Sequence, residues 1–129
     1  MKVAIIEDEP LAAEDLEKTL GQVDPDAEVV AKLASVQEAI EWLDGNDVDL
    51  ILSDIELGDG LSFDIFNEVE NTAPIIITTA YDQYAIRAFK ENSVDYLLKP
   101  IDKGELERAI EKYKHYRQNG QEFDMGNLL

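Results

Sequence analysis

The chain contains no cysteine and only one histidine, His115, among its 129 residues. Without thiols it can hold no disulfide, thiolate zinc site, iron–sulfur cluster or cysteine nucleophile. A single histidine argues against a multi-histidine metal centre and against a Ser–His catalytic triad. These absences narrow the kinds of site that the chain can carry.

Basic residues are also scarce, because 11 Lys and Arg stand against 29 Asp and Glu, which gives a formal net charge of −18. A chain so negative is repelled by nucleic acids and anionic membranes, so neither is expected as its direct partner. The excess lies wholly in residues 1–86, whereas residues 87–129 carry equal numbers of acids and bases. We expect most of these acids simply to solvate helix faces.

Long apolar runs are missing as well. No stretch approaches the roughly 20 apolar residues of a membrane span. The N-terminus lacks the pattern of a signal peptide. We therefore expect a cytoplasmic protein, and its length corresponds to one domain at roughly 100–200 residues per domain.

Short apolar segments alternate with helical patterns along most of the chain. The predicted strands are Val3–Ile6, Glu28–Leu33, Val48–Ser53, Pro74–Thr78 and Val94–Leu98. After each strand, apolar residues recur at helical spacing, as they do in residues 36–43, where Ser35 and Glu38 form a capping-box start. Five such units predict an α/β protein, a parallel sheet with helices on both faces. We expect residues 1–117 to form this domain and residues 118–129 to be a linker or disordered tail.

In open parallel sheets, ligands bind at the carboxyl ends of the strands. Four of the five predicted strands end in polar or charged side chains, which are Glu7 and Asp8, then Asp54 and Glu56, then Thr78 and Thr79, and finally Lys99 before Pro100. The carboxylates of Glu7, Asp8 and Asp54 are expected to converge, and their mutual repulsion calls for a cation. Ligand sets made only of oxygen suit Mg²⁺, Mn²⁺ or Ca²⁺.

A carboxylate, a divalent cation, the Lys99 ammonium and the Thr79 hydroxyl are the groups that an acyl phosphate needs around it. Aspartate is a known nucleophile in such chemistry, and the two cations offset charge on the transferring phosphoryl group. Taken singly, each residue has an ordinary explanation as a solvated acid, a turn cap, a strand end or a surface lysine. Their joint placement at four strand ends favours the functional interpretation.

The set Glu7-Asp8, Asp54, Thr79-Ala80 and Lys99-Pro100 resembles the receiver domain of bacterial two-component response regulators, over residues 2 to about 117. The resemblance implies a flavodoxin-like (βα)5 doubly wound sheet with strand order 2-1-3-4-5. The strings EDEPLAAEDL, ITTAYDQYAIRAF and SVDYLLKPID are similar to receivers of the LytTR (LytR/AlgR) class. In that class a C-terminal DNA-binding domain follows a linker, and this chain stops at Leu129 without one. The expectation is either a shortened regulator or a stand-alone receiver of a phosphorelay.

The resemblance also implies a role for each site residue. Asp54 would accept a phosphoryl group from a sensor histidine kinase. Asp8 would bind Mg²⁺ or Mn²⁺, with Glu7 beside it and the backbone carbonyl of Glu56 as a further ligand. Glu7 stands where many receivers have Asp, and the segment after Glu56 lacks a common Met-Pro, so the course of that loop stays open. The chain would be a regulatory domain that catalyses only its own phosphorylation and dephosphorylation.

By the same resemblance, Thr79 and Lys99 would each contact a phosphoryl oxygen, and Tyr96 would be the switch aromatic that turns inward as Thr79 moves. The fourth helix, fifth strand and fifth helix would form an output face that promotes a homodimer and controls transcription through the DNA-binding domain. Acids and bases mix there, with basic residues at Arg87, Lys90, Lys103, Arg108 and Lys112. Mixed charge suits a docking surface, although a plain soluble helix face explains it nearly as well.

Two other functions share parts of this pattern. A flavodoxin-like cofactor binder needs a Ser-, Thr- or Gly-rich loop after the first strand, and here Glu7–Pro10 would repel a flavin phosphate. A phosphatase of the haloacid dehalogenase type also forms an aspartyl phosphate, but it requires a second acid and a nearby Thr after the nucleophile. Residues 54–58 supply Glu56 and no Thr. Repeated turnover of a small phosphate ester would favour the phosphatase, and a single stoichiometric phosphorylation the receiver.

Overall fold

The computed structural model of the chain describes residues 1–70, 73–88 and 93–118. Its elements, in chain order, are β1 (Lys2–Ile6), α1 (Pro10–Val23), β2 (Glu28–Leu33), α2 (Val36–Leu43), β3 (Leu50–Ser53), β4 (Glu56–Leu57), β5 (Gly60–Leu61), α3 (Ser62–Glu68), β6 (Ile75–Thr79), α4 (Ala85–Ala88), β7 (Ser93–Leu98) and α5 (Lys103–Gln118). Of the predicted tail, Gln118 ends α5, and residues 119–129 lie outside the described residues.

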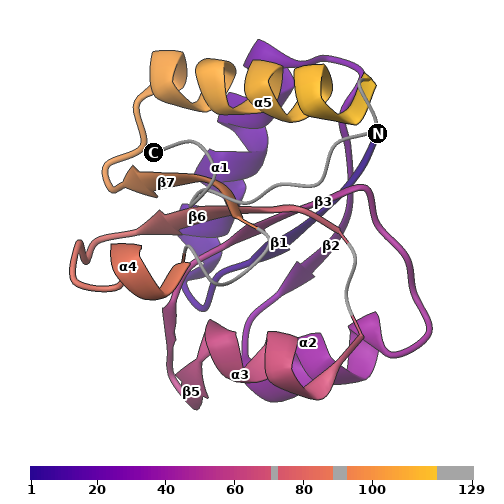
Figure 1. Cartoon of the computed structure of the whole chain (residues 1–129), viewed down its shortest axis with the longest axis vertical. Coiled ribbons are helices and arrows are strands. Elements are labelled where there is room, and N and C mark those ends of the chain that lie inside the picture. Colours follow the sequence, from indigo (N-terminus) through magenta and orange to yellow (C-terminus); the bar gives the residue numbers. More distant parts are fainter. Residues whose placement is uncertain (71–72, 89–92, 119–129) are drawn as a thin grey trace.

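Five parallel strands form the main sheet in the order β2-β1-β3-β6-β7, which confirms the predicted order 2-1-3-4-5 (Figure 1). The register aligns their carboxyl ends, since Ile6 of β1 pairs with Leu33 of β2 and Ser53 of β3. In the same way Thr79 of β6 pairs with Leu98 of β7. The residues that follow these strands therefore come out along one edge of the sheet.

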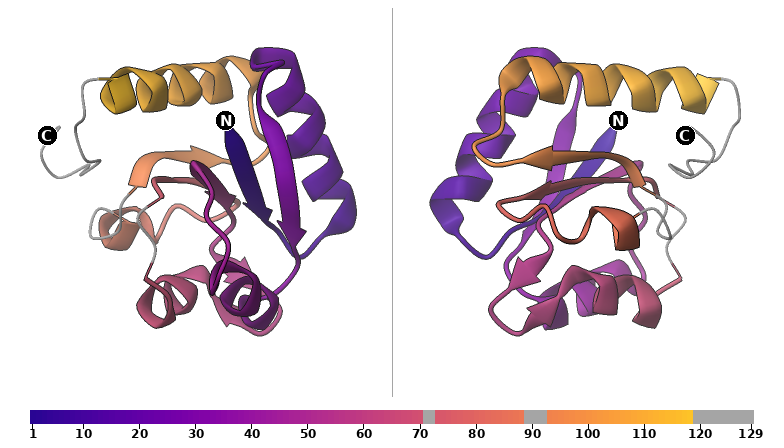
Figure 2. Two further views of the ribbon diagram at one scale, coloured as in Figure 1. Left: turned by 90° about the vertical axis from the view of Figure 1, so that its right-hand side faces the viewer. Right: turned by 60° about the vertical axis from the view of Figure 1, so that its left-hand side comes forward.

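Helices cover both faces of the sheet, as the alternating pattern predicted (Figures 1 and 2). Leu16 of α1 and Tyr113 of α5 belong to the hydrophobic core on one face, and Ala39 of α2 and Phe63 of α3 to the core on the other. All of the segment Val3–Ile6 is buried, because successive side chains of a strand enter opposite cores. Among the residues that the structure describes, no helix is long and apolar enough to cross a membrane.

The predicted capping signal at residue 35 is confirmed at the start of α2. The Ser35 hydroxyl accepts a hydrogen bond from the Glu38 amide at 3.0 Å, and the Glu38 carboxylate accepts one from the Ala34 amide at 3.3 Å. A capping residue of this kind satisfies helical N–H groups that have no partner within the helix. The helix therefore begins at Val36, with only Ala34 and Ser35 between it and β2.

The sequence pattern did not predict the antiparallel hairpin of β4 and β5, in which Glu56 pairs with Leu61 and Leu57 with Gly60. Gly60 follows the turn of this hairpin at a φ of 149°, a conformation that favours glycine. Two-residue strands are too short to show a hydrophobic period. The hairpin holds the segment after Asp54 close to the carboxyl edge of the sheet, between β3 and α3.

Candidate functional site

Three carboxylates meet at the carboxyl edge of the sheet. One oxygen from each of Glu7, Asp8 and Asp54 lies within 4.8 Å of the others. The backbone holds two of them in line with the strands, because the Glu7 amide donates to the Leu33 carbonyl and the Asp54 amide to the Ile6 carbonyl, both at 2.9 Å. Glu7 and Asp54 are buried, with 5% and 6% of their surfaces exposed, whereas Asp8 faces solvent. The convergence predicted from the strand ends is therefore present.

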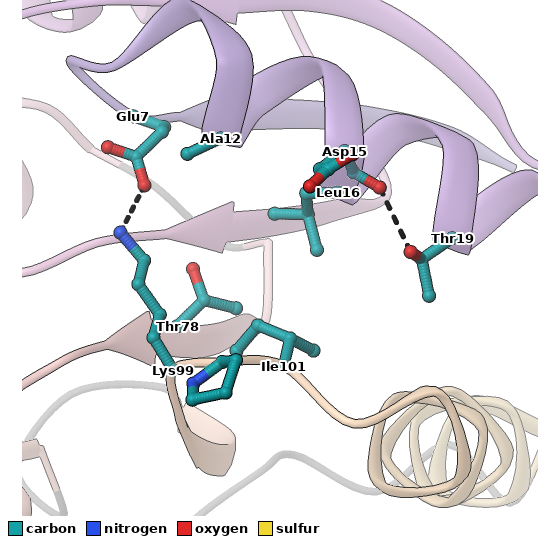
Figure 3. Close-up of a pocket in the computed structure, with 9 residues that line it drawn as sticks. Glu7, Ala12, Asp15, Leu16, Thr19, Thr78, Lys99 and Ile101 are labelled. Carbon is teal, nitrogen blue, oxygen red and sulfur yellow. Dashed lines mark hydrogen bonds and ion pairs between the residues drawn. The ribbon is translucent and has the colours of Figure 1, made fainter.

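Lys99 brings a positive charge into this cluster from the end of β7. Its backbone amide donates to the Thr79 carbonyl at 2.8 Å, and the following Lys99–Pro100 peptide bond is cis. Its ammonium lies 2.8 Å from Asp54 Oδ2. The ammonium also donates to Glu7 Oε1, and Figure 3 marks this pair with a dashed line between Glu7 and Lys99. One lysine thus pairs with two buried carboxylates.

Burial and charge act in opposite directions within the cluster. Burial raises the pKa of the Glu7 carboxyl, and the nearby Asp54 charge adds to this, although hydrogen bonds from Lys99 and the Glu9 amide work against it. Burial by itself lowers the pKa of Lys99, but its hydrogen bonds to Asp54 and Glu7 outweigh burial, so this pKa lies above its ordinary value. The lysine therefore stays charged, and the acids still outnumber it.

Thr79 and Tyr96, the residues predicted to switch, are joined by the backbone of Tyr81. Thr79 ends β6, is fully buried, and its hydroxyl oxygen lies 3.4 Å from the Tyr81 amide that donates to it. Tyr96 lies on β7, is half-buried, and its phenol donates to the carbonyl of the same Tyr81. Burial raises the pKa of Tyr96 above its ordinary value. A movement at Thr79 can reach Tyr96 through one residue.

Glu56 begins the hairpin two residues after Asp54 and is half-buried. The hairpin passes close to Asp8, because a Cβ built on Gly58 would lie 3.9 Å from Asp8 Oδ2. The sequence did not predict the contact that holds this hairpin, in which the Asp59 carboxylate accepts hydrogen bonds from the first amides of α2. The Asp59-Gly60 pair is an ordinary turn signal, and it gives no hint of a partner elsewhere in the chain.

Clefts on two sides of Glu7 leave the cluster open. A cleft of about 220 Å³ lies between α1 and the end of β7, and Figure 3 shows Ala12, Asp15 and Leu16 of α1 along one side of it, with Thr78 and Lys99 opposite. A second, of about 200 Å³, is lined by residues that include Glu7, Asp8 and Lys32. Small ions and their water can therefore approach the carboxylates.

The donors present fit a hard divalent cation. All three side chains offer carboxylate oxygen, and the exposed Asp8 leaves room for water beside the two buried acids. Mg²⁺ typically takes one or two carboxylates and keeps several waters, which a phosphate can replace. The cluster of Glu7, Asp8 and Asp54 could hold such an ion.

Comparison with known proteins identifies the family. The pattern of the response regulator receiver domain matches residues 3–111, so the chain belongs to this family of regulatory domains. It is 35% identical over 122 residues to the sensory transduction protein LytT of Bacillus anthracis, covering 92% of this chain and 49% of that protein. It is 37% identical over 119 residues to the transcriptional regulatory protein BtsR of Escherichia coli K12, covering 91% and 49%. The chain thus spans about half the length of these relatives.

Solved structures show the same fold. The response regulatory domain of mrkE from Klebsiella pneumoniae superposes with a TM-score of 0.81 at 28% identity, covering 92% of this chain and 99% of that one. The response regulator PhyR from Brucella abortus gives a TM-score of 0.79 at 27% identity, with 92% and 49% covered. The predicted flavodoxin-like α/β class and the predicted family are both confirmed.

Proposed function

We propose that this chain is a phosphorylation-dependent signalling switch in which Asp54 accepts a phosphoryl group from a sensor histidine kinase. The observation that carries the proposal is the contact of 2.8 Å between Lys99 Nζ and Asp54 Oδ2 inside the acidic cluster. Asp54 is a buried carboxylate with a fixed cation beside it and further acids close by. Such an arrangement stabilises the charge that develops during phosphoryl transfer and does not serve the stability of the fold alone.

In the proposed reaction, an Asp54 carboxylate oxygen attacks the phosphorus of a phosphohistidine. An O–P bond forms as the P–N bond breaks, and the departing imidazole nitrogen keeps the electron pair and takes up a proton. Lys99 is already within hydrogen-bond distance of Asp54, so its ammonium can follow the new phosphoryl oxygens without a large movement. The buried Thr79 hydroxyl at the end of β6 supplies a second contact to them.

Mg²⁺ would be held by Asp8, Asp54 and the backbone carbonyl of Glu56, with Glu7 beside it, and when bound it offsets the negative charge of the cluster and of the phosphoryl oxygens. Asp8 suits this position because it is the exposed member of the three acids. Mn²⁺ has the same preference for oxygen and is the expected substitute.

The switch is proposed to run through Tyr81. When the Thr79 hydroxyl turns to a phosphoryl oxygen, it leaves the Tyr81 amide, which it holds only at 3.4 Å. The Tyr81 backbone then shifts, Tyr96 loses the carbonyl that its phenol donates to, and its ring turns inward. The output face of α4, β7 and α5 changes as a result.

The proposed outcome is a homodimer that controls a C-terminal DNA-binding domain. The similar protein BtsR is a transcriptional regulatory protein, which supports an output in transcription. A groove on this face is lined by residues that include Leu98, Glu105 and Arg108. Leu98 is 45% exposed, and the groove has charges of both signs, which suits docking of a second copy. Arg87 lies in α4, and Lys90, predicted on this face, falls outside the described residues.

Labelling with a small acyl phosphate tests the proposal. With Mg²⁺, the chain should gain the mass of one phosphate, and Asp54→Asn should abolish this gain. Asp47→Asn is the matched control, because Asp47 is an exposed acid in the loop before β3 and should leave labelling unchanged. Labelling of Asp54→Asn at the rate of the unmodified chain would refute the assignment. Many turnovers of a phosphate ester per chain would favour the phosphatase instead.

A further inference from the structure

The carboxylate of Asp59 caps a helix that lies far from it in the sequence. Asp59 Oδ1 accepts a hydrogen bond from the Val36 amide at 2.8 Å, and Oδ2 accepts one from the Gln37 amide at 3.1 Å, across 23 and 22 residues. Ser35 takes the next amide, that of Glu38. Three amides in the first turn of α2 therefore have side-chain acceptors. The two Asp59 oxygens come from the hairpin after Asp54, and the Ser35 hydroxyl comes from the residue before the helix.

These contacts favour the ionised form of Asp59. The two amide hydrogen bonds hold the pKa of the Asp59 carboxyl below its ordinary value, although the side chain is exposed. The positive end of the helix dipole at the start of α2 acts in the same direction. The contact between the hairpin and α2 is therefore intact at neutral pH.

The hairpin that Asp59 holds also borders the acidic cluster. Glu56 lies three residues before Asp59. Gly58 lies next to Asp8, because a Cβ added to this glycine would lie 3.9 Å from Asp8 Oδ2. The base of the hairpin is closed by the Ser62 amide, which donates to the Ile55 carbonyl at 2.8 Å. With its base closed, the tip is held against α2 by Asp59.

We propose that Asp59 is a positioning residue for the cation site: its contact with the start of α2 holds the hairpin so that the Glu56 backbone faces Asp8 and Asp54. This inference rests on the proposed function for the cation itself. Positioning works in both directions, because a ligand that orders the hairpin must strengthen the contact between Asp59 and α2 by the same free energy.

The test compares Asp59→Ala with Ser35→Ala in the full chain, using calorimetric titration with Mg²⁺ alone. Both variants remove a cap from the same helix, but only Asp59→Ala releases the hairpin. Substitution of a residue that orients metal ligands typically weakens the affinity for the metal by about 10- to 100-fold, so Asp59→Ala should bind Mg²⁺ about tenfold more weakly. Ser35→Ala should keep the affinity of the unmodified chain. Asp59→Asn, which keeps one acceptor oxygen but no charge, should fall between.

Amide hydrogen exchange supplies a second readout. Mg²⁺ should slow exchange at the Val36 and Gln37 amides in the unmodified chain and should not do so in Asp59→Ala. Unchanged Mg²⁺ affinity in Asp59→Ala, or equal weakening in Ser35→Ala, would overturn the positioning role. If Asp59→Ala does not fold, Asp59→Asn with the same affinity and exchange as the unmodified chain would also overturn it.

Asp8→Asn separates this inference from the proposed function, because it removes a proposed ligand and leaves the hairpin contact in place. If Asp8→Asn binds Mg²⁺ as tightly as the unmodified chain, the proposed cation site is wrong and the positioning role is wrong with it. If Asp8→Asn weakens binding and Asp59→Ala does not, only the positioning role is overturned.

Discussion

Lys99 Nζ lies 2.8 Å from Asp54 Oδ2, although the strands that these residues directly follow, β7 and β3, are separated in the sheet by β6. The long lysine side chain crosses the end of β6, where Thr79 lies. The same ammonium pairs with Glu7 after β1. One lysine therefore links the ends of three strands, and changes at it should affect both stability and signalling.

Replacing Lys99 by Ala should leave two buried carboxylates without their cation. Breaking a buried pair costs about 3–5 kcal/mol, and because the Lys99 side chain is 26% exposed, we expect a loss of about 1–2 kcal/mol in the free energy of unfolding. Mg²⁺ should still bind and should restore part of this loss, while phosphorylation should no longer promote self-association. Urea unfolding with and without Mg²⁺, and sedimentation of the phosphorylated variant, measure these effects.

Lys114→Ala is the matched control for this variant, because Lys114, which lies in α5 and away from the acidic cluster, also pairs with a buried acid, Asp24, at 3.0 Å. It should lower stability without any restoration by Mg²⁺. A Lys99→Ala chain that dimerises on phosphorylation like the unmodified one would contradict the role of Lys99.

The raised pKa of Glu7 predicts a pH-dependent cost to stability without metal. A carboxyl whose pKa is higher in the folded than in the unfolded chain favours folding below the unfolded value, and this contribution is lost as pH rises through the folded value. Glu7→Gln, which cannot ionise, should therefore unfold at a higher temperature than the unmodified chain at neutral pH. The difference should shrink toward acid pH. Thermal unfolding in the presence of a chelator measures it.

In the presence of Mg²⁺, the unmodified chain should unfold at a higher temperature than Glu7→Gln, because the ion stabilises the carboxylate form that Glu7→Gln lacks. Thermal unfolding in saturating Mg²⁺ then serves as the control. A Glu7→Gln chain that is less stable than the unmodified one at every pH without metal would show that the pair with Lys99, and not burial, dominates at Glu7.

Self-association through the α4–β7–α5 face should depend on Arg108, which lines the groove with Glu105 and Leu98. Arg108→Glu places a third acid beside Glu105 and Asp95 and should prevent dimerisation of the phosphorylated chain through like-charge repulsion. Lys18→Glu, a charge reversal at an exposed position of α1, should leave dimerisation intact. Sedimentation velocity is the measurement, and a monomer in both phosphorylation states of the unmodified chain would remove the proposed dimer.

The last turn of α5 is fastened to the start of the sheet through Asp49. Its carboxylate accepts from the Lys2 amide at 2.7 Å and lies 3.0 Å from Arg117 Nη2, and the backbone hydrogen bond is the main reason that the pKa of Asp49 is lowered. Since these groups are partly exposed, Asp49→Asn should lower the free energy of unfolding by about 0.5–1 kcal/mol at neutral pH.

The lowered pKa of Asp49 also determines how the stability lost in Asp49→Asn should vary with pH. A carboxyl with a lowered pKa stabilises the folded chain above its unfolded value, here 3.8, and this stabilisation disappears as pH falls through the folded value. The Asp49→Asn chain and the unmodified chain should therefore become equally stable in acid. A constant difference down to low pH would mean that side-chain packing, and not charge, explains the loss.

The alternation of apolar segments predicted the five strands of the main sheet and their helices, with small errors at the ends. Strand β3 begins at Leu50 and not at Val48. The spacing of Leu61, Ile65 and Val69 predicts one helix, but α3 ends at Glu68, so Val69 lies beyond it in extended backbone. Residues such as Val48 and Val69 are apolar because they pack against the core, which continues past the last residue of a strand or helix. The hydrophobic period of the sequence reflects this burial. It reflects only indirectly the backbone hydrogen bonds that determine where a strand or helix ends.

By itself, the sequence determined that polar residues of distinct chemistry follow four strands, because hydrophobic periods of 2 and 3.6 are local and can be read within about ten residues. Only the tertiary structure decided that Glu7 and Asp54 are buried while Asp8 is exposed, that one lysine serves both buried acids, and that Asp59 caps α2. These relationships join segments that are 22 to 92 residues apart. They depend on distances through space and on exclusion of water, and neither has a local pattern in the chain.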